Sequence, residues 1–291
     1  MNNITIQSPA KLNLHLKVLR KRPDGYHDLL TLFHRISLSD TITIQKRKKG
    51  FRLSTNRRGL ETGEGSLITK AYRSLQKKFP ELGGVSVRLE KKIPLGAGLG
   101  GGSSNAAHFL LGMKKLFRLR ISRKELFKIG KTLGADVPFF LMDTSNAVAW
   151  GIGDKMRSLP FPSKLYFLLL VTDKGLKTKK VYQNLRVRKK PVSLTKEKRV
   201  AIILSSFFGT KRIREAAGLA ENDLESSAFV LRPSISRAVK ALRSAGASFA
   251  LMSGSGPTVF AVLENREKAE ALRRRSQARS LPYRKLICHT F

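Results

Sequence analysis

The sequence has very little cysteine, tryptophan or acidic charge. Among its 291 residues there is one Cys, one Trp and 20 Asp or Glu, against 57 Lys or Arg. The lone Cys288 excludes an internal disulfide, and the Cys and His ligands that a zinc site requires are not grouped around it. Because free thiols are typical of reducing compartments, Cys288 favours a structural thiol in a cytoplasmic protein.

Long hydrophobic runs are also missing. The N-terminal segment MNNITIQSPAKLNLHLKV has no apolar core of signal-peptide length, and the longest apolar runs are LYFLLLV (165–171) and AIIL (201–204). A helix that spans a bilayer needs about 20 apolar residues. We therefore expect neither export nor membrane insertion.

The excess of basic residues gives a formal net charge of +37, a field that attracts nucleic acid, anionic lipid or a polyphosphate substrate. The basic runs are KRKK (46–49), RVRKKPVSLTKEKR (186–199) and RRRSQAR (273–279). Few aromatic residues are interleaved with them, as a base-stacking platform would require. A solvated basic surface is the favoured interpretation, and nucleic-acid binding stays open as the second.

The chain is long enough for one large domain or two smaller ones, and we expect two. Alternating apolar residues predict strands at 4–7, 11–19, 41–45, 51–54 and 85–90. The apolar run 164–171 predicts a short buried strand, and 248–252 and 258–263 predict two strands that flank SGSGP. Helical spacing predicts helices at 66–79, 105–117, 122–134 and 234–247. Ser66 is available as an N-cap, and Ser122 with Glu125 has the spacing of a capping box closed by Gly134. The Pro- and Ser-rich segment 155–164 predicts domains at 1–155 and 156–291.

The stretch PLGAGLGGGSSNAA (94–107) concentrates glycine between a predicted strand and a predicted helix. Glycine allows backbone N–H groups to approach an anion closely, and the N-terminus of the following helix adds its dipole and free donors. The pattern therefore predicts a phosphate-binding loop, in which Ser103 and Ser104 could add hydroxyl oxygens to a phosphate or to Mg²⁺. A flexible glycine turn is the alternative, but a linker has no reason to adjoin so regular a helix.

Two familiar phosphate loops do not account for this stretch. A Walker A loop requires Lys and then Ser or Thr after its last glycine, whereas Gly101 is followed by Gly102 and Ser103. Gly96, Gly98 and Gly101 satisfy the Rossmann spacing, but the preceding strand alternates and no acidic residue ends a second strand about twenty residues later.

The whole stretch resembles the second motif of the GHMP kinases, P-x-G-x-G-L-G followed by small residues and two serines. Four further segments are similar to those of the 4-diphosphocytidyl-2-C-methyl-D-erythritol kinase family. They are SPAKLNLHLKVLRKRPDGYHDLLTLF (8–33), LGADVPFFL (133–141), ENDLE (221–225) and LMSGSGPTVFAVL (251–263). The motifs occur in the order that the family has them.

This resemblance implies an α+β, two-domain GHMP kinase fold, with an N-terminal domain like ribosomal protein S5 domain 2 and a ferredoxin-like C-terminal domain. It implies an ATP- and Mg²⁺-dependent kinase of the non-mevalonate isoprenoid pathway that phosphorylates the 2-hydroxyl of a cytidine diphosphate methylerythritol. We expect a monomer or weak homodimer with no specific nucleic-acid partner. Another GHMP kinase with a different acceptor, or a nucleic-acid-binding protein on an S5-like fold, remains an alternative.

The resemblance also assigns roles to residues. Asp136 would be the catalytic base, and its neighbours in GADVPF would limit water around it; an Asp that caps a helix or turn near Gly134 is the alternative. Lys11 would lie beside Asp136, keeping that carboxylate ionised and polarising the acceptor hydroxyl. The ATP phosphates would be held by Pro94, Leu95, Gly96, Ala97, Gly98, Leu99, Gly100, Gly101, Gly102, Ser103 and Ser104, with Ser104 as the Mg²⁺ ligand.

The same resemblance places the cytidine end of the substrate. Tyr26 would stack on the base, His27 would hydrogen-bond its edge, Tyr182 would close the stack, and Asn13 would lie nearby on the first strand. Residues 253–256 would form a second small-residue loop that lines the site, which is compatible with a hairpin turn. The chain departs from the family at Ser66, where an Asn often precedes Leu-Ile on the adenine side.

Overall fold

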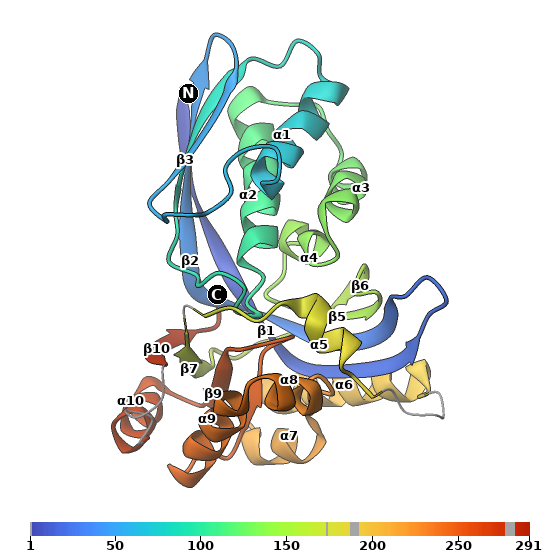
Figure 1. The fold of residues 1–291 in the computed structure, drawn as a ribbon, viewed down its shortest axis with the longest axis vertical. Coiled ribbons are helices and arrows are strands. Elements are labelled where there is room, and N and C mark those ends of the chain that lie inside the picture. The colour runs from blue at the N-terminus through green and yellow to red at the C-terminus, as the bar shows by residue number, and fades with distance from the viewer. Residues whose placement is uncertain (1, 173, 187–191, 277–282) are drawn as a thin grey trace. The chain divides into compact units, whose positions relative to one another are not determined.

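The computed structural model describes residues 2–172, 174–186, 192–276 and 283–291 (Figure 1). The chain forms two compact units, each built from discontinuous segments. Unit 1 comprises residues 1–10, 38–93 and 100–143, and unit 2 comprises residues 11–37, 94–99 and 144–291. The domain boundary expected after residue 155 falls at the first residue of a strand, β6 (Lys155–Ser158).

Unit 1 combines a sheet with four helices. Within it, the C-terminal half of β2 (His27–Arg47) pairs antiparallel with β4 (Gly84–Glu90), which pairs parallel with β3 (Phe51–Thr55). β1 (Asn3–Lys21) also pairs with β2. The helices are α1 (Leu67–Lys78), α2 (Gly101–Phe117), α3 (Arg123–Leu133) and α4 (Val137–Leu141). Figure 1 shows α1, α2 and α3 on one side of this sheet.

Local signals in the sequence account for much of unit 1. β4 buries Val85, Val87 and Leu89 at alternate positions, as a strand with one covered face requires. The capping box of α3 is confirmed, because Ser122 Oγ accepts the Glu125 N–H at 3.2 Å and Glu125 Oε2 accepts the Ser122 N–H at 2.9 Å. Ser66 occupies the N-cap of α1, but its side chain caps none of the described backbone N–H groups.

Unit 2 contains an antiparallel four-stranded sheet in the order β10-β7-β9-β8. Its strands are β7 (Tyr166–Val171), β8 (Ala250–Met252), β9 (Val259–Leu263) and β10 (Arg284–His289). Helices follow β7, a hairpin joins β8 to β9, and α10 (Arg266–Arg275) leads to β10. The expected ferredoxin-like arrangement has this βαββαβ order, with the last strand beside the first.

The remaining elements of unit 2 flank this sheet or extend β2. The N-terminal half of β2 pairs antiparallel with β5 (Asn146–Gly151), which pairs with β6. The helices between β7 and β8 are α5 (Thr178–Gln183), α6 (Leu194–Gly209), α7 (Ile213–Leu219), α8 (Glu225–Leu231) and α9 (Pro233–Ser244). Within the described ranges, no helix has the length and apolar character needed to cross a membrane.

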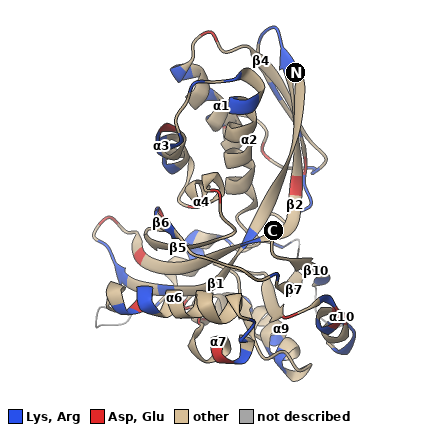
Figure 2. Cartoon of the chain, turned by 180° about the vertical axis from the view of Figure 1, so that it is seen from behind, with Lys and Arg blue, Asp and Glu red and all other residues tan. Residues whose placement is uncertain are grey.

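Lys and Arg residues occur on elements throughout both units (Figure 2). The basic helix α10 carries Arg273, Arg274 and Arg275 in its last turn, where positive charge complements the helix dipole. The strongest basic run, at 186–199, lies partly outside the described residues. Both interpretations of the basic charge stay predictions.

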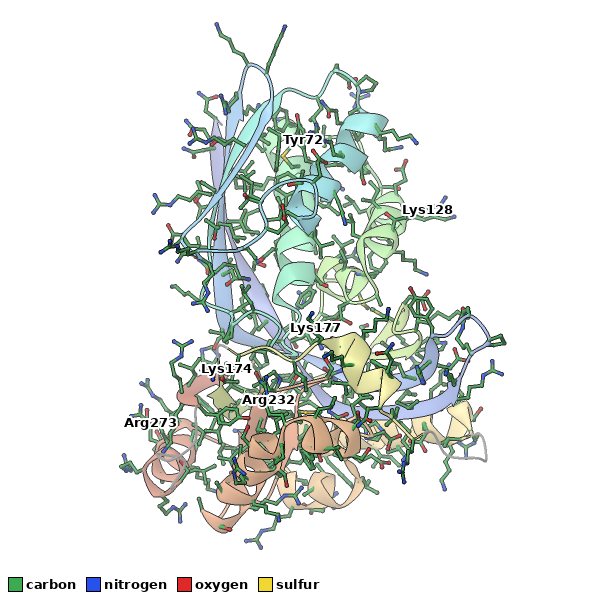
Figure 3. All side chains as sticks on the ribbon, viewed as in Figure 1. Tyr72, Lys128, Lys174, Lys177, Arg232 and Arg273 are labelled. Atoms are coloured by element: carbon green, nitrogen blue, oxygen red, sulfur yellow. The ribbon has the colours of Figure 1, made fainter. Side chains whose placement is uncertain are left out.

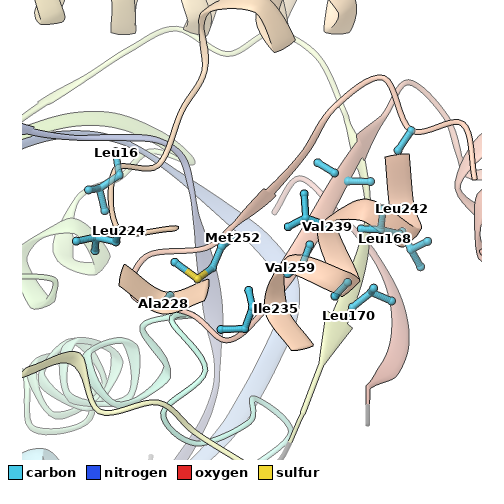
Figure 4. Packing of buried hydrophobic residues seen from close by; sticks show 14 of the residues in the cluster. Leu16, Leu168, Leu170, Leu224, Ala228, Ile235, Val239, Leu242, Met252 and Val259 are labelled. Atoms are coloured by element: carbon cyan, nitrogen blue, oxygen red, sulfur yellow. The ribbon is translucent and has the colours of Figure 1, made fainter. Parts of the chain in front are cut away.

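The core of unit 2 forms where α8 and α9 meet the four-stranded sheet (Figure 4). Leu168 and Leu170 of β7, Ile235 of α9 and Met252 of β8 are fully buried there. Leu168 faces Ala261 on one neighbouring strand and Ile287 on the other. The central strand β7 therefore contributes large buried aliphatic side chains to this core.

We predict that Leu168→Ala destabilises unit 2 by about 2–5 kcal/mol, because the lost transfer free energy adds to the cost of the cavity. Thermal unfolding followed by circular dichroism measures the effect as a lower midpoint. Val230→Ala is the matched control, since Val230 is 72% exposed on α8. Equal midpoints for the two variants would contradict this account of the core.

Candidate active site

The predicted phosphate loop adopts a conformation that requires glycine. The φ angles of Gly96, Gly98 and Gly100 are +60°, +74° and +68°, in the left-handed region. A Cβ on Gly98 would lie 2.1 Å from the carbonyl oxygen of Ser253 and 3.0 Å from the nitrogen of Gly256. The first glycine loop therefore packs backbone to backbone against the second, residues 253–256, which joins β8 to β9.

A second contact fixes the start of the first loop. The N–H of Leu176 donates to the carbonyl oxygen of Gly96 at 3.1 Å, and Gly175 lies against the same residue. Arg232 donates in turn to the carbonyl oxygens of Lys174 and Gly175. Figure 3 shows Arg232 and Lys174 in the same part of unit 2. This arginine holds the segment against which the loop rests.

The loop leads directly into α2, whose N-cap is Gly100. Ser104 donates the first helical hydrogen bond, to the carbonyl oxygen of Gly100 at 2.9 Å. The N–H groups of Gly101, Gly102 and Ser103 precede that bond and stand at the positive end of the helix dipole. Gly102 is exposed at this end of the helix. The backbone thus fits a phosphate group.

The hydroxyl of Ser104, the predicted Mg²⁺ ligand, belongs to a buried network of unit 1. Ser8 Oγ donates to Ser104 Oγ at 2.8 Å, and His108 Nδ1 lies 3.3 Å from the same oxygen. Asn105 Nδ2 donates to Ser8 Oγ at 2.9 Å. Ser103 is only half-buried. The assignment of Mg²⁺ to Ser104 stays a prediction.

Sequence reasoning missed Asp40, a fully buried carboxylate of β2. Its Oδ1 accepts the N–H groups of Lys92 at 2.7 Å and Ile93 at 2.9 Å, directly before the glycine loop. Its Oδ2 accepts Asn105 Nδ2 at 2.9 Å and pairs with Lys91 Nζ. Burial lowers the pKa of Lys91, and Asp40 opposes that shift. The sequence signal that could have identified Asp40 is an acidic residue inside an alternating strand, in a chain with few Asp and Glu residues.

Lys11 and Asn13 lie side by side on β1 in unit 2. Lys11 Nζ donates to Asn13 Oδ1 at 2.6 Å and to the carbonyl oxygen of Gly98 at 3.3 Å. Asn13 Nδ2 donates to Thr31 Oγ1 at 2.8 Å. Both side chains are buried, with 4% and 2% exposure. The predicted lysine therefore lies against the predicted phosphate loop, with its charge screened from water.

The second glycine loop contacts the same residues. Ser253 Oγ donates to the carbonyl oxygen of Gly98 at 3.0 Å and accepts the N–H of Asn13 at 3.3 Å. Gly254 has φ of +54°, and a Cβ there would lie 3.0 Å from Asn13 Oδ1. The hairpin turn thus packs against the first glycine loop, as the resemblance implied.

Two of the three predicted aromatic ligands meet in unit 2. The rings of His27 and Tyr182 have centroids 5.1 Å apart and an interplanar angle of 35°. Burial and, second, Lys21 lower the pKa of His27 below 6.5, so its imidazole is neutral at pH 7. Tyr26 is 62% exposed. Its role as a stacking residue stays a prediction.

Asp136 stands at the N-cap position of α4 in unit 1. Its side chain caps none of the described N–H groups of that helix. The following residues Pro138, Phe139 and Phe140 are buried, as the expected apolar surroundings require. The predicted pairing of Asp136 with Lys11 stays a prediction.

The comparisons with known proteins agree with this geometry. Residues 66–144 match the GHMP kinases N terminal domain, and residues 207–279 match the GHMP kinases C terminal domain. The chain is 44% identical to 4-diphosphocytidyl-2-C-methyl-D-erythritol kinase of Syntrophus aciditrophicus (strain SB) over 92% of each chain. It is 39% identical to the enzyme of the same name from Pelobacter propionicus over 94% of each chain.

A solved structure gives the same result. The fold matches the crystal structure of a 4-(cytidine 5'-diphospho)-2C-methyl-D-erythritol kinase with a TM-score of 0.81 and 32% identity, covering 98% of each chain. The chain is a GHMP kinase, with the α+β fold of that class. Within the class it belongs to the 4-diphosphocytidyl-2-C-methyl-D-erythritol kinase family.

We predict that Gly98→Ala abolishes most of the kinase activity, because a Cβ cannot stand 2.1 Å from the Ser253 carbonyl oxygen at a φ of +74°. Displacement of a reacting group by about 1 Å costs on the order of 100-fold in rate. ADP release measures the effect. Gly218→Ala is the matched control, since Gly218 has open space around it. Normal activity of Gly98→Ala would show that the two loops need not pack closely.

Proposed function

We propose that this enzyme uses ATP to phosphorylate the 2-hydroxyl of 4-(cytidine 5'-diphospho)-2-C-methyl-D-erythritol, a step of non-mevalonate isoprenoid precursor biosynthesis. The observation that carries the proposal is the hydrogen bond from the buried Lys11 to the Gly98 carbonyl oxygen. It brings a cation of β1 to the phosphate loop in a chain that belongs to this kinase family. Family membership supports ATP as the phosphoryl donor.

The backbone N–H groups at the start of α2 would bind the phosphates of ATP. Mg²⁺, when bound with those phosphates, neutralises the charge that develops during transfer. The hydroxyl oxygens at this helix end suit that ion, because Mg²⁺ prefers oxygen ligands. Ser104 is our proposed ligand, which requires its hydroxyl to exchange a bond to Ser8 or His108 for the ion.

Asp136 would accept the proton of the acceptor hydroxyl. The hydroxyl oxygen then forms a bond to the γ-phosphorus while the bond from that phosphorus to the β–γ bridging oxygen breaks, and ADP leaves. Lys11 would polarise the same hydroxyl and stabilise negative charge on the transferred group. Asn13 fixes the ammonium of Lys11 through its side-chain oxygen.

His27, Tyr26 and Tyr182 would recognise the cytosine. A neutral imidazole has one donor and one acceptor nitrogen, which suits the edge of cytosine with its amino donor and ring-nitrogen acceptor. Tyr182 lies against His27 and would hold that ring in place. Tyr26 offers the exposed ring on which a base can stack.

We propose that the enzyme works in the cytoplasm as a monomer or weak homodimer, without a specific nucleic-acid partner.

We predict that Asp136→Asn lowers kcat by about 100-fold or more, because general-base catalysis contributes factors of this order. The measurement is ADP release with Mg²⁺ and ATP, with the cytidyl substrate, mevalonate and homoserine offered separately. Only the cytidyl substrate is expected to support turnover by the unmodified enzyme.

Asp143→Asn controls for the lost charge, since Asp143 is exposed in the same unit. Undiminished turnover by Asp136→Asn would remove Asp136 from the mechanism. Turnover of mevalonate or homoserine in place of the cytidyl substrate would refute the acceptor.

We predict that the KM for the cytidyl substrate does not change near neutral pH and rises only in the acidic range, as pH falls through the lowered pKa of His27. The pKa of His27 is lower than 6.5, so this ring gains a proton and loses its acceptor nitrogen only in the acidic range. His27→Gln keeps a donor and an acceptor at every pH and is expected to lose the acidic rise. An identical rise in both enzymes would assign it to another group.

A further inference from the structure

The segment 221–225, ENDLE, holds the second glycine loop through side chains that the proposed mechanism does not use. We propose that Asn222 is a positioning residue for phosphoryl transfer, which sets the geometry of the loop at 253–256 and through it that of Gly98 and Lys11. The inference rests on the proposed function, because it concerns the same site.

The amide of Asn222 makes all its hydrogen bonds inside unit 2. Its Nδ2 donates to two carbonyl oxygens, that of Met252 at 2.7 Å and that of Gly254 at 2.8 Å. Its Oδ1 accepts the N–H of Leu224 at 3.0 Å. The side chain is 5% exposed. One planar amide therefore fixes two carbonyl groups that flank Ser253.

Glu225 makes a further hydrogen bond next to the same loop. Its Oε1 accepts the N–H of Met252 at 2.7 Å. The peptide groups at the end of β8 thus meet a donor from Asn222 and an acceptor from Glu225. Figure 4 shows Met252 near Ala228 of α8 and Ile235 of α9, with which it shares the buried core, so its side chain anchors the same point.

Asn222 is itself fixed to the strand that carries Lys11. The N–H of Leu16 donates to the carbonyl oxygen of Glu221 at 2.8 Å, and the N–H of Asp223 donates to that of Leu16 at 3.0 Å. These bonds make a parallel bridge between Leu16 and Asn222. Lys17 Nζ also pairs with Glu221 at 2.5 Å. The segment that holds the second loop is therefore bonded in a fixed register to β1, the strand that carries Lys11.

The held loop reaches the proposed reacting groups directly. Ser253 lies between the two carbonyl groups that Asn222 binds, and its hydroxyl donates to the Gly98 carbonyl oxygen at 3.0 Å. Lys11 Nζ donates to that same oxygen at 3.3 Å. A shift of the second loop would therefore move the oxygen that helps to fix the Lys11 ammonium.

The chemistry at position 222 requires an amide. Aspartate has nearly the same shape, but it would place a carboxylate oxygen against two carbonyl oxygens in a buried site. Buried acceptors without donors are costly, so the loop would move away or the carboxyl would take a proton. A protonated aspartate regains one donor of the two.

The test compares Asn222→Asp with the unmodified chain in the ADP-release assay with the cytidyl substrate. We expect kcat per folded enzyme to fall by about 10- to 100-fold, the scale of a small misplacement at a reacting group, while both KM values change by less than about threefold. The ratio of the variant's kcat to the unmodified kcat should rise as pH falls, because protonation restores a donor.

Asn265→Asp is the matched control. Asn265 caps α10 by accepting the Lys268 N–H at 2.9 Å, and aspartate caps as well as asparagine. We expect unmodified kcat and no change of its ratio with pH. This variant adds the same charge to the same unit without touching the loop.

Three results would overturn the inference. They are an unchanged kcat for Asn222→Asp, a fall that the unfolded fraction in circular dichroism fully explains, and a kcat ratio that does not change with pH. Should Asn222→Asp fail to fold, Asn222→Ser keeps one donor without a charge, and unmodified kcat in that variant would overturn it too. Turnover of the unmodified chain is measured first. If it used another acceptor, the proposed function would fail, and the kcat ratio measured with that acceptor would still decide on Asn222.

Discussion

The buried polar face of β1 is the constraint on which the site in unit 2 depends. Lys11, Asn13, His15 and Lys17 alternate along the strand, and none is more than 4% exposed. Buried polar groups are costly unless they are hydrogen-bonded, so each needs a partner supplied from elsewhere in the chain. The Gly98 carbonyl oxygen and Asn13 serve Lys11, the Glu221 N–H reaches His15 Nδ1 at 3.3 Å, and Glu221 pairs with Lys17. The hydrogen bonds that offset the cost of burying these polar side chains also hold the loops of the site against β1.

The same constraint explains why glycines occupy the first loop. Their role at Gly98 is close approach, since any side chain would meet the backbone of the second loop. The N–H of Thr258 adds a bond to the Ala97 carbonyl oxygen at 3.4 Å, and Leu176 binds Gly96. So many backbone contacts hold the phosphate loop in one shape through the protein's own groups. A loop held in this way spends little of the substrate's binding free energy on ordering.

Local signals predicted much of the fold, and the resemblance predicted the site. Alternation located β4, the SGSGP segment located the strands on either side of the second loop, and the Ser122 capping box located α3, because each of these signals spans only a few residues. The burial of Lys11 could not be derived from alternation, since both faces of β1 are covered and polar residues occupy one of them. The roles of Asp40 and Asn222 were not predicted for a related reason. Their backbone hydrogen-bond partners lie 52 and 30 residues away along the chain. No periodic pattern records such contacts.

The two residues that escaped prediction do similar work at two different loops. Asp40 binds successive N–H groups just before the first glycine loop, and Asn222 binds two carbonyl groups at the ends of a turn in the second. A carboxylate can only accept in its ionised form, whereas the NH₂ group of an amide can only donate, so each side chain matches the backbone groups that its loop leaves unpaired. The glycines of these loops have no side chains that could supply these bonds. Their shape must therefore be set from outside, which makes distant polar residues as necessary to the phosphate loop as the glycines themselves.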